Sequence, residues 1–206
     1  MSFKALYELY MADIKPRIRP TTYHNKEHLF MTKILPTFEK LSCDKITPAK
    51  IRQWQNELIK QNYRDTYLRT INNQLTAIFT FAVNYYGLQA NPVKRAGLIG
   101  KRNADPMKFW TVDDFQKFIA HTTSPLYKII FSILFWTGMR VGELLALTSN
   151  DFNFDKNIVS ITKTCTRLHR KDLIGPPKTP KSTRDLTMPI FLAKEVQEYI
   201  LSLHAF

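Results

Sequence analysis

The first ninety residues repeat one pattern, in which hydrophobic side chains stand three or four positions apart and polar side chains fill the gaps. This spacing is typical of amphipathic helices that bury one face. Four such segments occur, at residues 2–14, 21–36, 47–58 and 65–86. Four helices in this length predict a compact helical bundle.

Capping and breaking residues set the expected ends of these helices. Ser2 and Thr47 are candidate N-caps because their hydroxyl oxygens can accept a backbone N–H of the first turn. Pro36 is expected to stop the second helix, since proline lacks the donor that a helix interior needs. Gly87 is expected to close the fourth helix in a left-handed conformation.

The pattern breaks at Asn91-Pro92, and residues 93–105 are basic, contain two glycines and show no sustained periodicity. We therefore predict a helical domain at 1–92, a basic linker at 93–105 and a second domain at 106–206. The linker is either an ordinary solvated connection or a strap that lies against phosphates. Both interpretations stay open.

The second domain mixes helices with short strands. Thr111 and Asp114 resemble a capping box at the start of one helix. The apolar run Tyr127–Trp136 predicts a buried core helix, too short to cross a bilayer. Further segments with clear patterns are a short helix at 141–147, strands at 158–162 and 183–188, and a last helix at 190–203. The chain is thus mainly α with a small antiparallel β-element.

The amino-acid composition indicates to which classes of protein the chain can belong. The 206 residues are 44% hydrophobic and 23% charged, which fits a folded domain and excludes a disordered tail. Lys and Arg outnumber Asp and Glu by 30 to 17, a net charge of +13 that attracts polyanions. Both parts of the chain are basic, with 13 basic against 7 acidic side chains up to residue 92 and 17 against 10 beyond it. Nucleic acid is the expected partner, and no membrane is expected.

Several kinds of chemistry are excluded by missing motifs. Neither a GxxxxGK[ST] phosphate loop nor a GxGxxG fingerprint occurs, so an ATPase of that kind is not expected. The five histidines show no spacing of metal ligands, and we expect no metal. The two cysteines, Cys43 and Cys165, offer no disulfide framework, and the first residues lack the long apolar core of a signal peptide, so we expect none. We expect a cytoplasmic protein.

Two segments carry candidate chemistry. Arg140 lies between two glycines at a junction of helices, where its guanidinium could be fixed as a phosphate clamp with Glu143 orienting it. Lys178 belongs to the sequence PKTPKSTR, expected at the tip of a basic β-hairpin, from which an ammonium could donate a proton. Taken singly, a structural Arg–Glu pair and a solvated loop are the simpler interpretations.

Together, a basic helical domain, TGMRVGELLAL and PKTPKSTR in this order resemble the tyrosine recombinase (phage integrase) family. The resemblance implies a SAM-like core-binding domain at 1–92 and the N-terminal part of an α+β catalytic domain at 106–206. It implies that Arg140 is the first catalytic arginine, Glu143 its supporting acid and Lys178 the lysine that protonates the leaving 5′-oxygen. It also implies strand exchange through a 3′-phosphotyrosyl intermediate without metal or nucleotide cofactor, on double-stranded DNA, by a tetramer of protomers.

The sequence departs from the family after the last helix. The family's His-x-x-Arg motif and its nucleophilic tyrosine are not found before Phe206. Tyr199 follows the Lys178 segment, but it falls on the apolar stripe of the last helix and is interpreted as a core residue. We therefore expect that these 206 residues bind DNA but do not cut it.

Candidate DNA contacts lie on the polar faces of the first domain and in the linker. Arginine and asparagine can read base edges, whereas lysines mostly hold phosphates. The candidates are Lys26, Arg69, Asn73, Lys94, Arg95, Lys101 and Arg102. Two alternatives remain: a non-catalytic DNA-binding module, or remnant, that occupies recombination sites, and a helical protein-interaction domain with incidental charge.

Overall fold

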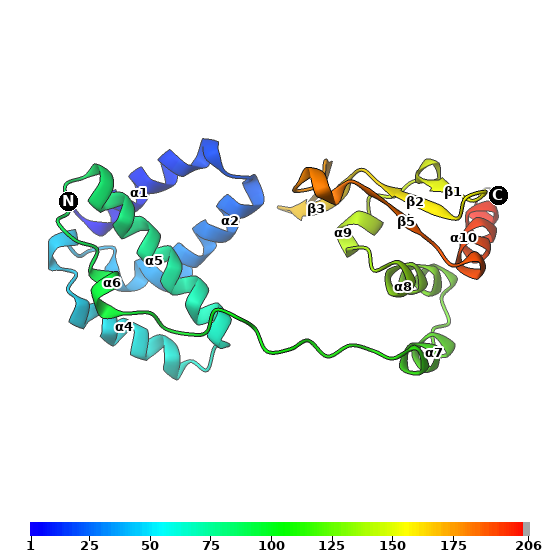
Figure 1. Ribbon diagram of the computed structural model, residues 1–206. Helices are drawn as coiled ribbons and strands as arrows, with labels where there is room; N and C mark the ends of the chain where they lie inside the picture. Colours follow the sequence, from blue (N-terminus) through cyan, green and yellow to red (C-terminus); the bar gives the residue numbers. More distant parts are fainter. Residues whose placement is uncertain (204–206) are drawn as a thin grey trace. The chain divides into compact units, whose positions relative to one another are not determined.

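The computed structural model describes residues 1–203 and divides into two compact units, with the division between Met107 and Lys108 (Figure 1). Helices dominate both units, and the strands form small antiparallel sheets in the second. The predicted fold class, mainly α with a small β-element, is confirmed.

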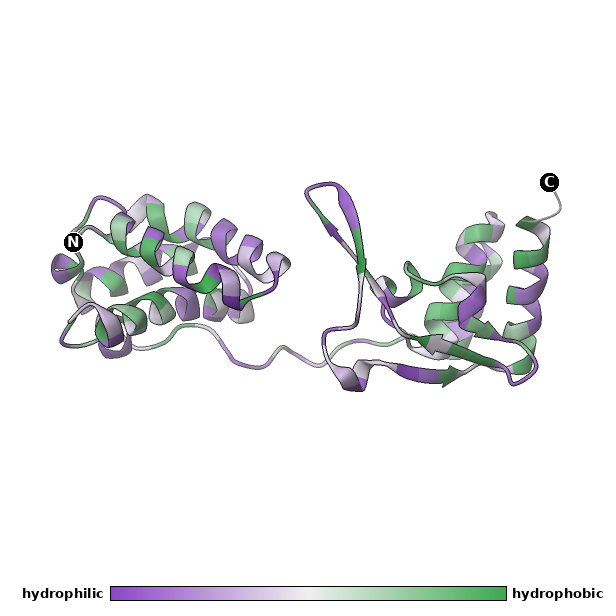
Figure 2. Cartoon of the chain, turned by 90° about the horizontal axis from the view of Figure 1, so that it is seen from above, coloured by the Kyte–Doolittle hydropathy of each residue, from purple (hydrophilic) through white to green (hydrophobic). Residues whose placement is uncertain are grey.

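The first unit is a helical bundle around an aromatic core. Phe3 lies at its centre, with ring centroids 5.8 Å from Phe38 and 5.7 Å from Phe79. Hydrophobic and hydrophilic residues alternate around its helices in Figure 2, as amphipathic packing requires. The elements are α1 (Phe3–Ile14), η1 (Lys15–Arg17), α2 (Pro20–Leu29), η2 (Phe30–Ile34), α3 (Leu35–Phe38), η3 (Cys43–Lys45), α4 (Pro48–Lys60), α5 (Asp65–Tyr85) and α6 (Pro92–Ala96).

The predicted caps are confirmed. The Ser2 hydroxyl accepts the Ala5 N–H at 3.2 Å and begins α1, and the Thr47 hydroxyl begins α4 in the same way. Gly87, with φ of +69°, lies just beyond α5, where the next residue donates its N–H to the Ala82 carbonyl. Local capping chemistry therefore sets these helix ends.

Pro36 does not stop the second helix, so that prediction was wrong. The helix passes through η2, a π-helical turn, and continues as α3 to Phe38, which is fully buried. Leu35 donates its N–H to the carbonyl of Phe30, five residues back. This irregular pairing immediately before the proline is the kind of helix distortion that accommodates a residue without an N–H.

The first part of the predicted linker belongs to the first unit. Val93, Ala96 and Ile99 are buried in its core, and α6 occupies residues that we expected to be irregular. The Asn91 side chain holds this segment by accepting the Val93 N–H at 2.9 Å and donating to the Thr76 carbonyl of α5 at 2.9 Å. The expected boundary at residue 92 is therefore too early, because hydrophobic residues beyond it complete the bundle.

The second unit places helices against a three-stranded antiparallel sheet of order β1-β2-β5. Ile158 pairs with Thr187 and Ile161 with Arg184, while Val159 and Met188 lie in the core. The elements are α7 (Val112–Ala120), α8 (Pro125–Thr137), α9 (Val141–Leu144), η4 (Ser149–Asp151), β1 (Phe152–Asn153), β2 (Ile158–Ile161), β3 (Thr164–Leu168), β4 (Lys171–Gly175), η5 (Pro180–Ser182), β5 (Arg184–Thr187) and α10 (Ile190–Leu203).

Strands β3 and β4 form a separate hairpin that the sequence did not indicate. Its two-residue tip is His169-Arg170, with φ of +49° and +63°. Such turns usually carry glycine or asparagine, so this one lacks the usual signal. The segment Pro177–Arg184, predicted as a hairpin tip, instead belongs to the connection from β4 to β5, which contains η5, and ends on Arg184, the first residue of β5. That prediction was wrong because the intervening hairpin was missed.

Helix α8 is less buried than its apolar sequence predicted. Of its residues only Ser132 and Ile133 are buried, whereas the Tyr127 side chain is largely exposed. Leu203 of α10, also expected inward, is exposed as well. The neighbours of α8 within residues 108–203 cover only part of its surface. Within residues 1–203, none of the helices combines the length and hydrophobicity that a membrane-spanning segment requires.

Candidate functional site

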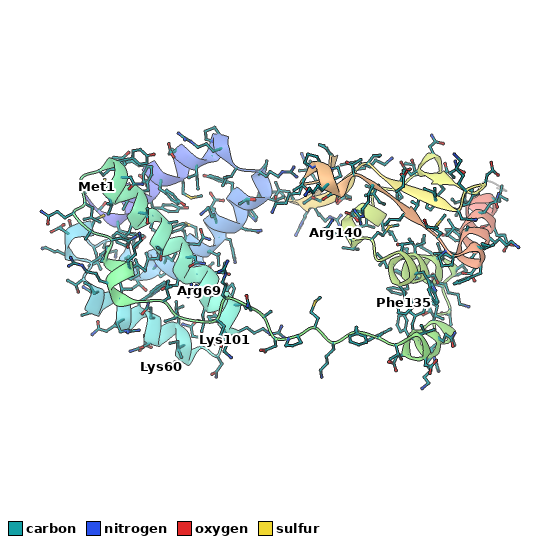
Figure 3. The ribbon with its side chains drawn as sticks, in the orientation of Figure 1. Met1, Lys60, Arg69, Lys101, Phe135 and Arg140 are labelled. Carbon is teal, nitrogen blue, oxygen red and sulfur yellow. The ribbon has the colours of Figure 1, made fainter. Side chains whose placement is uncertain are left out.

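Arg140 lies where the sequence placed it, between two helices. Helix α8 ends at Thr137 and is capped by Gly138, whose φ of +64° is left-handed and whose N–H donates to the Leu134 carbonyl at 3.1 Å. Arg140 is then extended, with φ of −77° and ψ of 147°, and is the N-cap residue of α9. Figure 3 labels it beside this short helix. The glycine turn therefore fixes the backbone from which the guanidinium extends.

Glu143 anchors this arginine. Its side chain is only 3% exposed, and one carboxylate oxygen accepts the Arg140 backbone N–H at 2.8 Å. The other oxygen accepts the Arg140 guanidinium, also at 2.8 Å. The Arg140 side chain remains 70% exposed, so most of its donors face solvent. A buried carboxylate thus holds one edge of an accessible cation, as the sequence predicted for this pair.

Arg184, which sequence reasoning did not select, is the second partner of Glu143. Its two terminal nitrogens donate to the two carboxylate oxygens at 3.0 and 2.9 Å, a bidentate pair. It also donates to the carbonyl of Ser182 at 3.0 Å. The available signal was its place at the end of PKTPKSTR, but its partner lies 41 residues away in sequence.

The side chains of Arg140, Glu143 and Arg184 form a cluster with a net positive charge. Hydrogen bonds from the Arg184 guanidinium lower the pKa of Glu143 to about 2; burial opposes this shift, and hydrogen bonds from Arg140 add to it. The same carboxylate raises the pKa of Arg184 above its ordinary value. Two guanidinium groups share one carboxylate, which leaves one excess positive charge. A cluster of this kind can hold an anion such as a phosphate.

Lys178 lies in the exposed connection between β4 and η5, six residues before Arg184. Further along this connection, the side-chain hydroxyls of Thr179 and Ser182 are hydrogen-bonded at 3.0 Å. Lys178 therefore shares a segment with the arginine that binds Glu143. Among residues 1–203, no group of three or more His, Cys, Asp and Glu side chains is arranged to hold a metal ion.

Tyr199 of α10 is half-buried, and it lines a pocket with Trp136 of α8 and Phe191 of α10. Tyr199 is therefore only partly buried and is not among the buried core residues of the second unit, where we expected it.

In the first unit, Lys26 is less available than its place on a polar face indicated. Its ammonium donates to the Tyr10 hydroxyl at 3.0 Å and to the Gln74 side-chain oxygen at 2.5 Å. It also lies 5.4 Å from the centre of the Tyr10 ring. Lys26 therefore links α2 to α1 and α5, and only part of its donor capacity remains for another ligand.

Three further candidates gather at α5. Arg69 and Asn73 are four residues apart and thus on one face of this helix, Asn73 being exposed. Lys101 pairs with Asp65 of the first turn at 3.3 Å. Gly100 permits this approach, because a Cβ there would stand 2.0 Å from the Asp65 carbonyl oxygen. Figure 3 shows Arg69 and Lys101 near the same part of α5.

The remaining candidates lie on α6 and next to Lys101. Lys94 and Arg95 are exposed on α6, and Arg102 is exposed in the irregular segment that follows. The structure thus places the segment before Lys101 against Asp65 and Arg69 of α5. It puts Asn73 on the same face of that helix one turn further on, and attaches Lys26 to the same helix. It leaves Lys94 and Arg95 on a separate element.

Comparison with known proteins identifies related sequences. The family described as phage integrase, N-terminal SAM-like domain, matches residues 2–59. ICEBs1 integrase from Bacillus subtilis (strain 168) is 30% identical over 97% of this chain and 54% of its own length. The integrase of Mycobacterium phage L5 is 26% identical over 82% of this chain and 44% of its own length. The chain spans about half the length of these relatives.

Solved structures share the fold. The Tn1549 transposon integrase, determined in complex with a circular intermediate DNA, has a TM-score of 0.82 at 18% identity, covering 97% of this chain and 65% of the other. A lambda integrase dimer bound to a COC′ core site has a TM-score of 0.69 at 18% identity, covering 85% of this chain and 62% of the other. At this identity the likeness establishes the architecture of the chain.

Proposed function

Because this chain belongs to the tyrosine recombinase family, we propose that it takes part in site-specific DNA recombination of the kind that integrates phages and other mobile elements. The observation that carries the proposal is the Arg140 guanidinium, accessible on one side and anchored on the other by a buried carboxylate. Its planar fork suits two oxygens of one scissile phosphate.

In the proposed chemistry, Arg140 holds non-bridging oxygens of the phosphate and stabilises the charge that develops there. A tyrosine hydroxyl loses its proton to solvent and forms the new bond to phosphorus. The bond to the 5′-oxygen breaks, and Lys178 gives that oxygen a proton. Glu143 orients Arg140 and does not exchange protons near neutral pH, because its pKa is about 2. The exposed position of Lys178 supports its access to a bound strand.

Duplex DNA is the proposed substrate, and the first unit its main binding surface. The proposed contacts are Lys26, Arg69, Asn73 and Lys101 around α5, with Lys94, Arg95 and Arg102 beyond it. The Tn1549 integrase structure contains DNA, and one lambda integrase structure is a tetramer bound to a Holliday junction. By analogy, we propose that this protein assembles with other protomers on DNA in the cytoplasm.

We further propose that these 206 residues bind DNA without forming a covalent bond to it. They contain no His-x-x-Arg sequence, and Tyr199, which follows the Lys178 segment, lines a pocket with Trp136 and Phe191. Incubation with a mixed-sequence duplex followed by denaturing electrophoresis should leave all DNA unattached. A detergent-resistant protein–DNA adduct would overturn this proposal.

The phosphate clamp is tested by fluorescence anisotropy with a labelled mixed-sequence duplex at several salt concentrations. Arg140→Ala should weaken binding and reduce the salt slope by about one. Arg167→Ala is the matched control, since Arg167 is 72% exposed and also pairs with one carboxylate, that of Asp172. Equal losses in both variants would indicate a general charge effect. Unchanged binding in Arg140→Ala would favour the alternative of a non-catalytic DNA-binding module.

A further inference from the structure

We infer that Arg184 is a positioning residue, which acts through Glu143 to orient Arg140 and to leave its charge available for a phosphate. This inference rests on the proposed role of Arg140 as a phosphate clamp. Arg184 begins β5, whereas Arg140 and Glu143 belong to the start of α9, so the three residues join separate elements of one unit.

The geometry at Glu143 is the first argument. Each carboxylate oxygen accepts one hydrogen bond from Arg140 and one from Arg184, four in all, at 2.8 to 3.0 Å. Bidentate contact by Arg184 fixes the plane of the carboxylate. Since the same carboxylate holds the Arg140 guanidinium, fixing its plane also restricts where Arg140 can point.

The charge balance is the second argument. Without Arg184, the nearly buried carboxylate of Glu143 would neutralise Arg140 and compete with a phosphate for its donors. Arg184 supplies the compensating positive charge and has the larger effect on the pKa of Glu143. Arg140 therefore keeps a net positive charge for its ligand.

Arg184 itself is poorly placed to bind the phosphate. Its side chain is 29% exposed, compared with 70% for Arg140. One of its terminal nitrogens is shared by Glu143 and the Ser182 carbonyl, and the other is used by Glu143. Arg184 also donates to the Ser182 carbonyl, in the connection that carries Lys178. It therefore links this connection to Glu143 at the start of α9.

A double-mutant cycle tests the inference on the 206-residue chain with the same labelled duplex. Arg184→Gln should weaken binding roughly three- to tenfold in the parent. It should cause no further loss in an Arg140→Ala background, because the residue through which it acts is gone. Additive losses would mean that Arg184 contacts DNA directly and would overturn the inference. Arg184→Lys, which keeps the charge but loses the fork, should restore only part of the affinity.

A second measurement separates this inference from the proposed function. In NMR spectra without DNA, the Nε–H resonance of Arg140 should shift in Arg184→Gln and the carboxyl of Glu143 should titrate at a higher pH. An unchanged Arg140 resonance in a folded variant would overturn the positioning role, whatever the DNA result. If the resonance shifts while Arg140→Ala leaves DNA binding intact, the clamp proposal fails and the positioning role stands.

Discussion

Gly142 packs so closely against Cys165 that no side chain fits between them. A Cβ on Gly142 would stand 2.7 Å from the Cys165 carbonyl oxygen and 2.9 Å from the Thr164 hydroxyl. Gly142 immediately precedes Glu143 in α9, and Cys165 belongs to β3. The base of the β3–β4 hairpin therefore lies directly against α9, the helix that carries Glu143.

Gly142→Ala should destabilise the second unit by about 1–3 kcal/mol, the usual cost of overpacking. The added methyl group must displace β3 backbone, which cannot move as a side-chain end can. Urea unfolding monitored by circular dichroism measures the change. Gly175→Ala is the control, because a Cβ at this position in β4 meets no atom within 4 Å. Equal stability of the two variants would contradict the close contact.

Acid should weaken the second unit through Glu143. Its pKa is about 2 in the folded protein, below the ordinary value of 4.5. A lowered folded-state pKa contributes stability above about pH 5, and that contribution is lost as the pH falls toward 2. The free energy involved is on the order of 3 kcal/mol.

The variant Glu143→Gln isolates this effect. Above pH 5, the free energy of unfolding of this variant should differ from that of the parent by a constant amount. The reason is that Glu143 of the parent is ionised there in both the folded and the unfolded state. Below pH 5 the parent should lose stability faster, so that the two curves approach each other. Curves that stay parallel down to pH 2.5 would show that this carboxyl is not held in its ionised form by the arginines.

Arg69 should contribute to the choice of DNA sequence. A preferred site is first selected from a pool of random duplexes, and Arg69→Ala is then compared on this site and on unselected DNA. If Arg69 reads a base, the loss should be about 1–3 kcal/mol on the selected site and small on the other. Lys60→Ala is the control, since Lys60 is a 71% exposed cation on α4 of the same unit. Equal loss on both duplexes would assign Arg69 to the phosphates.

Asn91 should hold α6 against the bundle. It is buried, and Asn91→Ala removes the acceptor of the Val93 N–H and the donor to Thr76. Leaving a buried N–H without a partner costs about 1–3 kcal/mol. The expected results are a lower urea midpoint and faster amide exchange at Val93. Gln89→Ala, at an exposed position two residues earlier, should change neither.

The parts of the fold that the sequence predicted are those decided within one turn of a helix. Ser2 and Thr111 cap helices through contacts with residues three positions away, and Gly87 ends α5 by its own conformation. Arg140 was placed correctly for the same reason, because Gly138 and Glu143 are its near neighbours in sequence.

The parts that were missed depend on distant partners or unusual conformations. The His169-Arg170 turn adopts positive φ without glycine or asparagine, so the β3–β4 hairpin had no local signal. Arg184 gains its role from Glu143, which only the pairing of β5 with β2 and the packing of α9 bring within reach. Tertiary packing supplied information that residue spacing does not contain.

The π-helical turn at Phe30–Ile34 holds one residue more than a regular helix would need there. Leu35 donates its N–H to the carbonyl of Phe30, five residues back, whereas an α-helix pairs residues four apart. Removing the exposed Thr32 from the turn would make this bond α-helical and leave Phe38 in its place beside Phe3 and Trp54. Removing a residue from a regular helix would instead rotate everything after it by about 100°. Related chains should therefore tolerate the loss of one residue at this turn better than elsewhere in the helices of the bundle.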